Sequence, residues 1–143
     1  MFGALLVGYG RPVNDAVSMA VVAHLARELN AHVPPPFSID STGSSLVLLE
    51  ADGRKARLVA SVPLDDVVAD LEVGCDRLED GLADFRDDVA MALRARWPLD
   101  EGAGGTPICA LETGVLRIRF QGPSSELRLA DLNLDPGEPR TAG

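Results

Sequence analysis

A regular apolar stripe between Pro63 and Trp97 constrains the fold of this chain more than any other feature of its sequence. Its members recur at steps of three or four residues, which places them on one side of an α-helix. They are Leu71, Cys75, Leu78, Leu82, Phe85, Val89 and Leu93. The opposite side carries a series of carboxylates: Asp70, Glu72, Asp76, Glu79, Asp80, Asp84, Asp87 and Asp88. We therefore predict one long acidic amphipathic helix over residues 64–97.

Two glycines, Gly74 and Gly81, lie inside this predicted helix on nearly the same face. Each costs about 1 kcal/mol relative to alanine in a helix interior. We therefore expect that another backbone approaches the helix closely there, or that the helix bends or breaks near Gly74.

The segment before this helix begins with a second, shorter predicted helix over residues 14–30. Its buried side carries Val17, Ala20, Val21, His24, Leu25 and Leu29. The apolar residues 2–9 predict a short strand, with a backward extension of the helix as the alternative. Three consecutive prolines at 34–36 predict a stiff extended connector.

Asp52-Gly53 between two apolar runs predicts a β-hairpin formed by residues 46–50 and 55–62. That turn sets Glu50 opposite Lys55. We predict that the core packs against the face that carries Val47, Leu49, Ala51, Ala56, Leu58 and Ala60.

The segment after the long helix predicts a second hairpin and a last strand. The hairpin joins residues 108–112 to 115–120, and alternating apolar residues predict that its second strand is half-buried. Residues 126–134 predict a further strand. Its apolar phase shifts between Leu129 and Leu132, which favours a bulge or an early end.

Hairpins that alternate with helices are typical of an α+β domain. We predict an antiparallel sheet of about four to six strands built from the two hairpins, with both helices packed on one face. This single domain covers residues 1–134. Residues 135–143 contain no large apolar side chain, so we expect them to form a disordered C-terminal tail.

The charge balance argues against two classes of partner. The 143 residues include 22 Asp and Glu against 13 Lys and Arg, a formal net charge of −9. Nucleic acids and anionic membranes bind clustered Lys and Arg, so we expect neither as a partner. The apolar N-terminal run is short and has no basic residue before it, and no stretch approaches the ~18 apolar residues of a membrane span. We therefore expect a cytoplasmic protein.

No motif assigns a chemistry to the chain. Residues 8–10 match the start of a dinucleotide-binding fingerprint, but Val13 stands where its third glycine belongs. Residues 131–135 have the ligand spacing of a calcium loop, but Pro136 replaces the required glycine.

The two histidines and two cysteines also form no recognisable set. His24 and His32 lack the spacing of zinc ligands, and His24 is expected to be structural. Cys75 and Cys109 are expected to be buried free thiols, because a bridge between them needs an oxidising compartment. We predict no metal, no cofactor and no catalytic residue, although catalytic partners that meet only in space stay open.

The order of elements over about residues 12–134 resembles two small bacterial architectures. One is the secretion-chaperone-like fold, an α+β unit that dimerises and holds client proteins. The other is the roadblock-type regulatory module, in which a helix and a hairpin precede a second helix and more strands. Neither resemblance assigns a role to a residue of this chain.

We predict a non-catalytic protein-binding module of a bacterial or phage genome: a chaperone, an adaptor, or an antitoxin- or immunity-type inhibitor. The expected partner is a protein with a basic surface, and the sequence is also compatible with a homodimer. The predicted interaction residues are Asp76, Glu79, Asp80, Asp84, Asp87, Asp88, Arg117 and Arg119.

Arg117 and Arg119 belong to a second candidate surface, the polar side of the second hairpin, together with Ala110, Glu112 and Val115. The alternative function is a small enzyme or ligand-binding domain with a pocket near His24 and His32.

Overall fold

The computed structural model describes residues 2–64 and 71–134, with side chains at 16–64 and 75–134. Its helices are α1 (Phe2–Asn30) and α2 (Leu71–Leu93). Sheet A contains β1 (Phe37–Thr42), β2 (Ser45–Asp52) and β3 (Lys55–Pro63), in that order. Sheet B contains β4 (Thr106–Glu112), β5 (Val115–Gln121) and β6 (Glu126–Arg128), and β7 (Leu132–Asn133) also pairs with β5.

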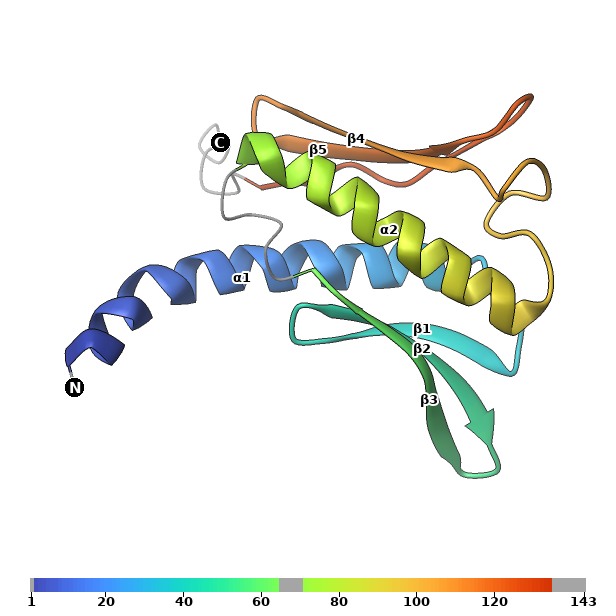
Figure 1. The fold of residues 1–143 in the computed structure, drawn as a ribbon, viewed down its shortest axis with the longest axis horizontal. Coiled ribbons are helices and arrows are strands. Elements are labelled where there is room, and N and C mark those ends of the chain that lie inside the picture. The colour runs from blue at the N-terminus through green and yellow to red at the C-terminus, as the bar shows by residue number, and fades with distance from the viewer. Residues whose placement is uncertain (1, 65–70, 135–143) are drawn as a thin grey trace, which may run out of the picture.

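The fold is α+β, with two helices and antiparallel strand pairs as the sequence predicts. The prediction of one sheet is wrong, because the two hairpins belong to separate sheets. Both helices lie between these sheets in Figure 1. Helix α1 packs on β1 and β2, and α2 packs on β4 and β3. The helices therefore bridge the sheets instead of covering one face of a single sheet.

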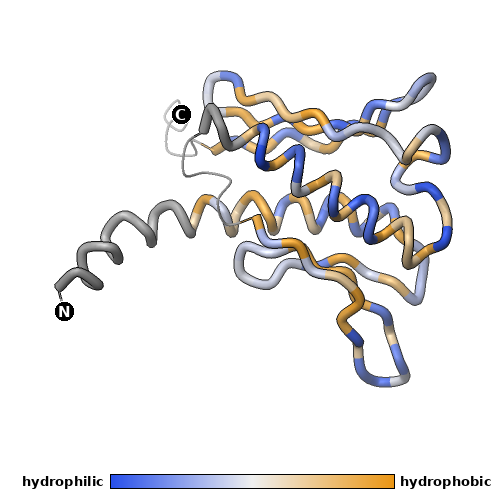
Figure 2. The backbone as a smooth tube through the Cα atoms, viewed as in Figure 1, coloured by the Kyte–Doolittle hydropathy of each residue, from blue (hydrophilic) through white to orange (hydrophobic). Residues whose placement is uncertain are grey.

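One cluster of buried apolar residues joins these layers. Helix α2 contributes Leu78, Leu82, Phe85 and Val89, while Cys75 and Leu93 are partly buried at its two ends. The remaining core residues come mainly from α1 and from both sheets, and Figure 2 shows apolar stretches on all of them. The tip of the β2–β3 hairpin is hydrophilic in the same view.

Helix α1 extends from Phe2 to Asn30, so the predicted strand over residues 2–9 is wrong and the alternative, a longer helix, is confirmed. A short apolar run does not by itself distinguish a strand from a helix segment. The predicted end of the helix at Asn30 agrees with the structure. Among its predicted inward residues, Ala20 is exposed.

Helix α2 is shorter than predicted. It ends at Leu93, and Arg94 then adopts a left-handed backbone with φ of 57°, a common way to terminate a helix. Helix α2 is continuous through Gly74, and the predicted residues 65–70 lie outside the described part of the chain. At Gly81 the close neighbour is the side chain of Leu64, not another backbone.

The first hairpin differs from its prediction in register and in its buried face. Asp52 pairs with Lys55, so Glu50 lies opposite Arg57 and not opposite Lys55. A β-bulge lies between the pair that Leu48 forms with β3 and the pair that Leu49 forms with β3. It reverses the face to which the β3 side chains point on the turn side of the bulge. Leu46 and Leu48 of β2 and Val62 of β3 lie in the core. Of the predicted inward set, Val47 is buried, whereas Leu58 is 57% exposed.

Two further strands complete the comparison with the sequence. Strand β1 was not predicted, because Phe37 and Ile39 are its only large apolar residues. The predicted strand 126–134 is present as β6 and β7, with a break at residues 129–131 where the apolar phase shifts. The predicted tail at 135–143 lies outside the described residues.

Candidate functional site

The outer face of sheet B carries a group of arginines. Successive side chains of a strand point to opposite faces, so the buried Leu116, Ile118 and Phe120 of β5 leave Arg117 and Arg119 on the outside. In the neighbouring β6, Arg128 pairs with Arg119. The sheet therefore brings three guanidinium groups to one surface.

These arginines line a depression of about 390 Å³, which we call the arginine pocket. Its lining residues are Ala110, Glu112, Arg117, Ile118, Arg119, Arg128 and Asp131. Its volume is within the range of small-molecule sites, which is roughly 300–1,000 Å³. The lining has three positive and two negative charges, in a chain whose formal net charge is −9.

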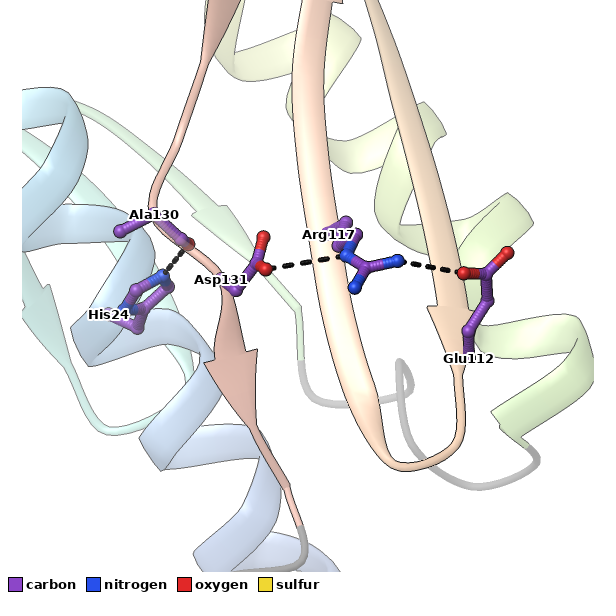
Figure 3. A network of polar contacts seen from close by, with 5 residues as sticks. All are labelled: His24, Glu112, Arg117, Ala130 and Asp131. Atoms are coloured by element: carbon purple, nitrogen blue, oxygen red, sulfur yellow. Dashed lines mark hydrogen bonds and ion pairs between the residues drawn. The ribbon is translucent and has the colours of Figure 1, made fainter.

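Carboxylates in and beside the pocket pair with the arginines at the protein surface. Arg117 contacts Glu112 at 2.8 Å and Asp131 at 3.3 Å, as Figure 3 shows. Glu126 lies 3.8 Å from Arg119 and 3.3 Å from Arg128. Exposed pairs of this kind contribute only about 0–1 kcal/mol each. An incoming anion can therefore replace a carboxylate at little cost.

Helix α1 fixes one wall of the pocket through Ala130. Ala130 lies between β6 and β7, outside the strand pairs. His24 Nε2 donates a hydrogen bond to the carbonyl oxygen of Ala130 at 2.7 Å, and Glu28 accepts one from its N–H at 2.9 Å. Figure 3 shows that Asp131, the next residue, then points to Arg117.

His24 is buried and does not line the pocket, so it supports the wall and leaves the lining to other residues. The side chain of His32 is exposed. The carbonyl oxygen of His32 accepts a hydrogen bond from Trp97 Nε1 at 2.8 Å. The two histidines that the sequence singled out therefore have separate structural roles.

The predicted acidic surface on α2 contains both exposed carboxylates and carboxylates that are partly buried. Asp76, Asp80, Asp84 and Asp87 are exposed, while Glu79 and Asp88 are partly buried. Glu79 accepts a hydrogen bond from the Cys109 N–H at 2.7 Å. Arg86 donates to the Gly105 carbonyl at 2.8 Å and pairs with Asp87 at 2.9 Å. Glu79 and Arg86 thus attach α2 to the edge of sheet B.

Sequence reasoning found part of the pocket and missed the rest. Arg117 and Arg119, predicted as interaction residues, lie in it together with Ala110 and Glu112. Arg128 was missed, although the alternation of Glu126, Leu127 and Arg128 is a signal that its side chain points outward. Asp131 was considered only as part of a calcium-loop spacing.

The other candidate motifs give no second site. Residues 8–10 lie inside α1, not in a loop between a strand and a helix. Across the described residues, no group of His, Cys, Asp and Glu side chains is arranged to hold a metal ion. As far as the structure describes them, neither helix is long and apolar enough to cross a membrane.

Comparison with known proteins yields one informative similarity. The chain is 33% identical over 96 residues to a protein of Solibacter usitatus (strain Ellin6076), described as ribosomal RNA small subunit methyltransferase G. The aligned region covers 67% of this chain and 45% of that protein, so the chain spans less than half the length of its relative. No protein-family model matches the chain. No solved structure matches it either.

This similarity overturns the predicted function. The sequence predicted a non-catalytic protein-binding module, but the relative is an enzyme by its description. The finding supports the alternative prediction, a small enzyme or ligand-binding domain. The prediction failed because it relied on the absence of a catalytic motif, and residues that form a site often meet only in the folded chain.

Proposed function

We propose that this chain is a small ligand-binding domain that holds an anionic group in the arginine pocket. The observation that carries the proposal is the placement of Arg117, Arg119 and Arg128 around one depression of suitable size. Guanidinium groups offer several N–H donors in a plane and bind carboxylate or phosphate through paired hydrogen bonds. The ligand class is therefore a small molecule with a phosphate or carboxylate group.

The long ion pairs in the pocket support this assignment. Asp131 and Glu126 lie 3.3–3.8 Å from their arginine partners, whereas a strong charged hydrogen bond is shorter, about 2.7–2.9 Å. A ligand anion that approaches more closely would take over these donors. Glu112, which already contacts Arg117 at 2.8 Å, would stay in place and orient that guanidinium.

The experiment that tests the proposal is a titration of the protein with inorganic pyrophosphate and with citrate, followed by amide NMR at low salt. We expect the amides of β5 and β6 to shift, and Arg119→Ala to raise Kd by about tenfold or more. Arg57→Ala is the matched control, since Arg57 is an exposed strand arginine that also pairs with a glutamate. Equal weakening by both substitutions, or no shift in β5 and β6 at millimolar anion, would refute the proposal.

A second candidate function follows from the relative's description. A methyltransferase of ribosomal RNA acts on a phosphate-rich polymer, and the arginine pocket offers a place for one of its phosphates. The net charge of −9 opposes a large RNA interface. Filter binding of small-subunit ribosomal RNA separates the candidates. Binding that falls steeply with salt and is weakened by Arg119→Ala would favour an RNA-directed enzyme over a domain for small anions.

Location in the cytoplasm and pairing of two copies of the chain stay predictions from the sequence. The cytoplasmic prediction can be checked by cell fractionation, and the pairing by sedimentation of the purified chain.

A further inference from the structure

The two cysteines of the chain lie beside each other on neighbouring elements. Cys75 belongs to α2 and Cys109 to β4, and both side chains are partly buried. Helix α2 and β4 pack together, as Figure 1 shows. Both side chains pack against the shared core, and Cys75 is one of the neighbours that raise the pKa of the Cys109 thiol. The sequence contains no other cysteine that could compete for either of them.

An independent contact fixes this arrangement. Glu79 follows Cys75 by four residues, so both side chains lie on the same face of α2, one turn apart. The Glu79 carboxylate holds the Cys109 N–H at 2.7 Å. The backbone of Cys109 is therefore attached to the same helix face from which the Cys75 side chain projects. The juxtaposition follows from the packing of α2 on the edge of sheet B.

We propose that Cys75 and Cys109 are a modification site that closes to a reversible disulfide when the protein meets a low-molecular-weight disulfide such as oxidised glutathione. The thiolate of one cysteine attacks the reagent and releases one glutathione thiolate, leaving a mixed disulfide on the protein. The second cysteine then attacks the protein sulfur of that mixed disulfide and releases the second glutathione thiolate. Two protein thiols are oxidised, one reagent disulfide is reduced, and the two thiol protons end on glutathione or solvent.

The surroundings indicate which thiol reacts first. Burial raises the pKa of the Cys109 thiol, and the Cys75 thiol and the charges of Glu79 and Asp76 raise it further. The thiolate is the nucleophile in exchange, so Cys109 is a poor first attacker. We therefore expect Cys75 to form the mixed disulfide and Cys109 to resolve it. This order makes the two single-cysteine variants distinguishable.

The test incubates the full chain in glutathione buffers of increasing oxidation, quenches with acid, and measures the intact mass. Wild type is expected to lose the mass of two hydrogens and to regain it with dithiothreitol. Cys109→Ser is expected to carry one glutathione, and Cys75→Ser to acquire it more slowly. Two glutathiones on the folded wild-type chain, or an unmodified chain in the most oxidising buffer, would overturn the proposal.

A second measurement does not depend on the folding of the variants. The disulfide would join α2 to sheet B across the intervening loop, so oxidised wild type is expected to unfold roughly 5 °C above the reduced protein. Without oxidation, dithiothreitol should leave the unfolding temperature unchanged. An intramolecular disulfide that forms only together with loss of the circular dichroism signal would also overturn the proposal, because the bond would then belong to the unfolded chain.

Discussion

At the scale of single residues, Glu101 shows how one carboxylate joins two loops. It accepts hydrogen bonds from the hydroxyl groups of Ser124 and Ser125 at 2.6 and 2.7 Å. It also accepts bonds from their backbone N–H groups at 2.9 and 2.8 Å. All four bonds favour the ionised carboxylate. They lower the pKa of Glu101 from 4.5 to about 2, with the hydroxyl of Ser124 as the largest cause.

This lowered pKa predicts an acid-dependent contribution of the Glu101 contacts to stability. The contribution is complete above the ordinary pKa of 4.5, and it is lost as the pH falls through the folded-state pKa of about 2. An NMR titration of the Glu101 side chain is therefore expected to show a midpoint near 2, and Glu101→Gln is expected to reduce the loss of stability in acid. Asp100→Asn, a change at the exposed neighbouring carboxylate, is the control and should leave the Glu101 midpoint unchanged. A Glu101 midpoint at its ordinary value would show that the four contacts do not form in solution.

At the scale of elements, the sequence correctly predicts the helices and strands whose buried face follows from their own apolar periodicity. Strand β5 has a strict alternation, and its buried Leu116, Ile118 and Phe120 follow that alternation. The buried stripe of α2 likewise follows from helical spacing alone. The first hairpin is less predictable, because a bulge between the pairs of Leu48 and Leu49 changes which face of β3 is buried. Nothing local in the sequence marks that bulge.

The candidate site was only partly predictable for a related reason. Arg117 and Arg119 are adjacent on one strand face, so the sequence places them together. Arg128 and Asp131 reach the pocket only because β6 and the segment after it return to β5. The support from His24 to Ala130 links residues that are 106 positions apart in the sequence. Such contacts depend on how the elements assemble, which periodicity does not specify.

Gly81 gives a prediction about how α2 packs on the end of sheet A. Replacing glycine by alanine in a helix interior ordinarily stabilises the folded protein by about 1 kcal/mol. Here a Cβ atom would collide with the Cδ2 atom of Leu64, whose side chain is buried, and overpacking typically costs about 1–3 kcal/mol. We therefore expect Gly81→Ala to lower the free energy of unfolding by about 1 kcal/mol in urea titrations.

The matched control for this prediction is the double variant. Leu64→Ala removes the atom that collides, so Gly81→Ala in that background should stabilise by about 1 kcal/mol, as in an open helix. A stabilising effect of Gly81→Ala in the wild-type chain would mean that Leu64 adopts another rotamer at no cost.

At the scale of the whole molecule, the two sheets share one core and should not unfold separately. The cluster includes Ile39 and Leu48 from sheet A and Ile118 and Phe120 from sheet B. Phe85 of α2 is fully buried in this cluster. Its ring meets that of Trp97 edge to face, with 6.4 Å between the ring centroids. A cavity at Phe85 would therefore remove contacts on which both layers depend.

We expect Phe85→Ala to lower the free energy of unfolding by about 3–5 kcal/mol, a large share of the total for a domain of this size. The fluorescence of Trp97, the only tryptophan of the chain, reports on the shared core, whereas far-UV circular dichroism reports on all strands and helices. With a shared core, both signals should change at one urea midpoint in wild type, and at one lower midpoint in the variant. Leu58→Ala, at a leucine that is 57% exposed on β3, is the control and should change stability little. Two separate midpoints in wild type would mean that the sheets fold as independent units. The loss of stability caused by Phe85→Ala would then be confined to the layer that contains α2.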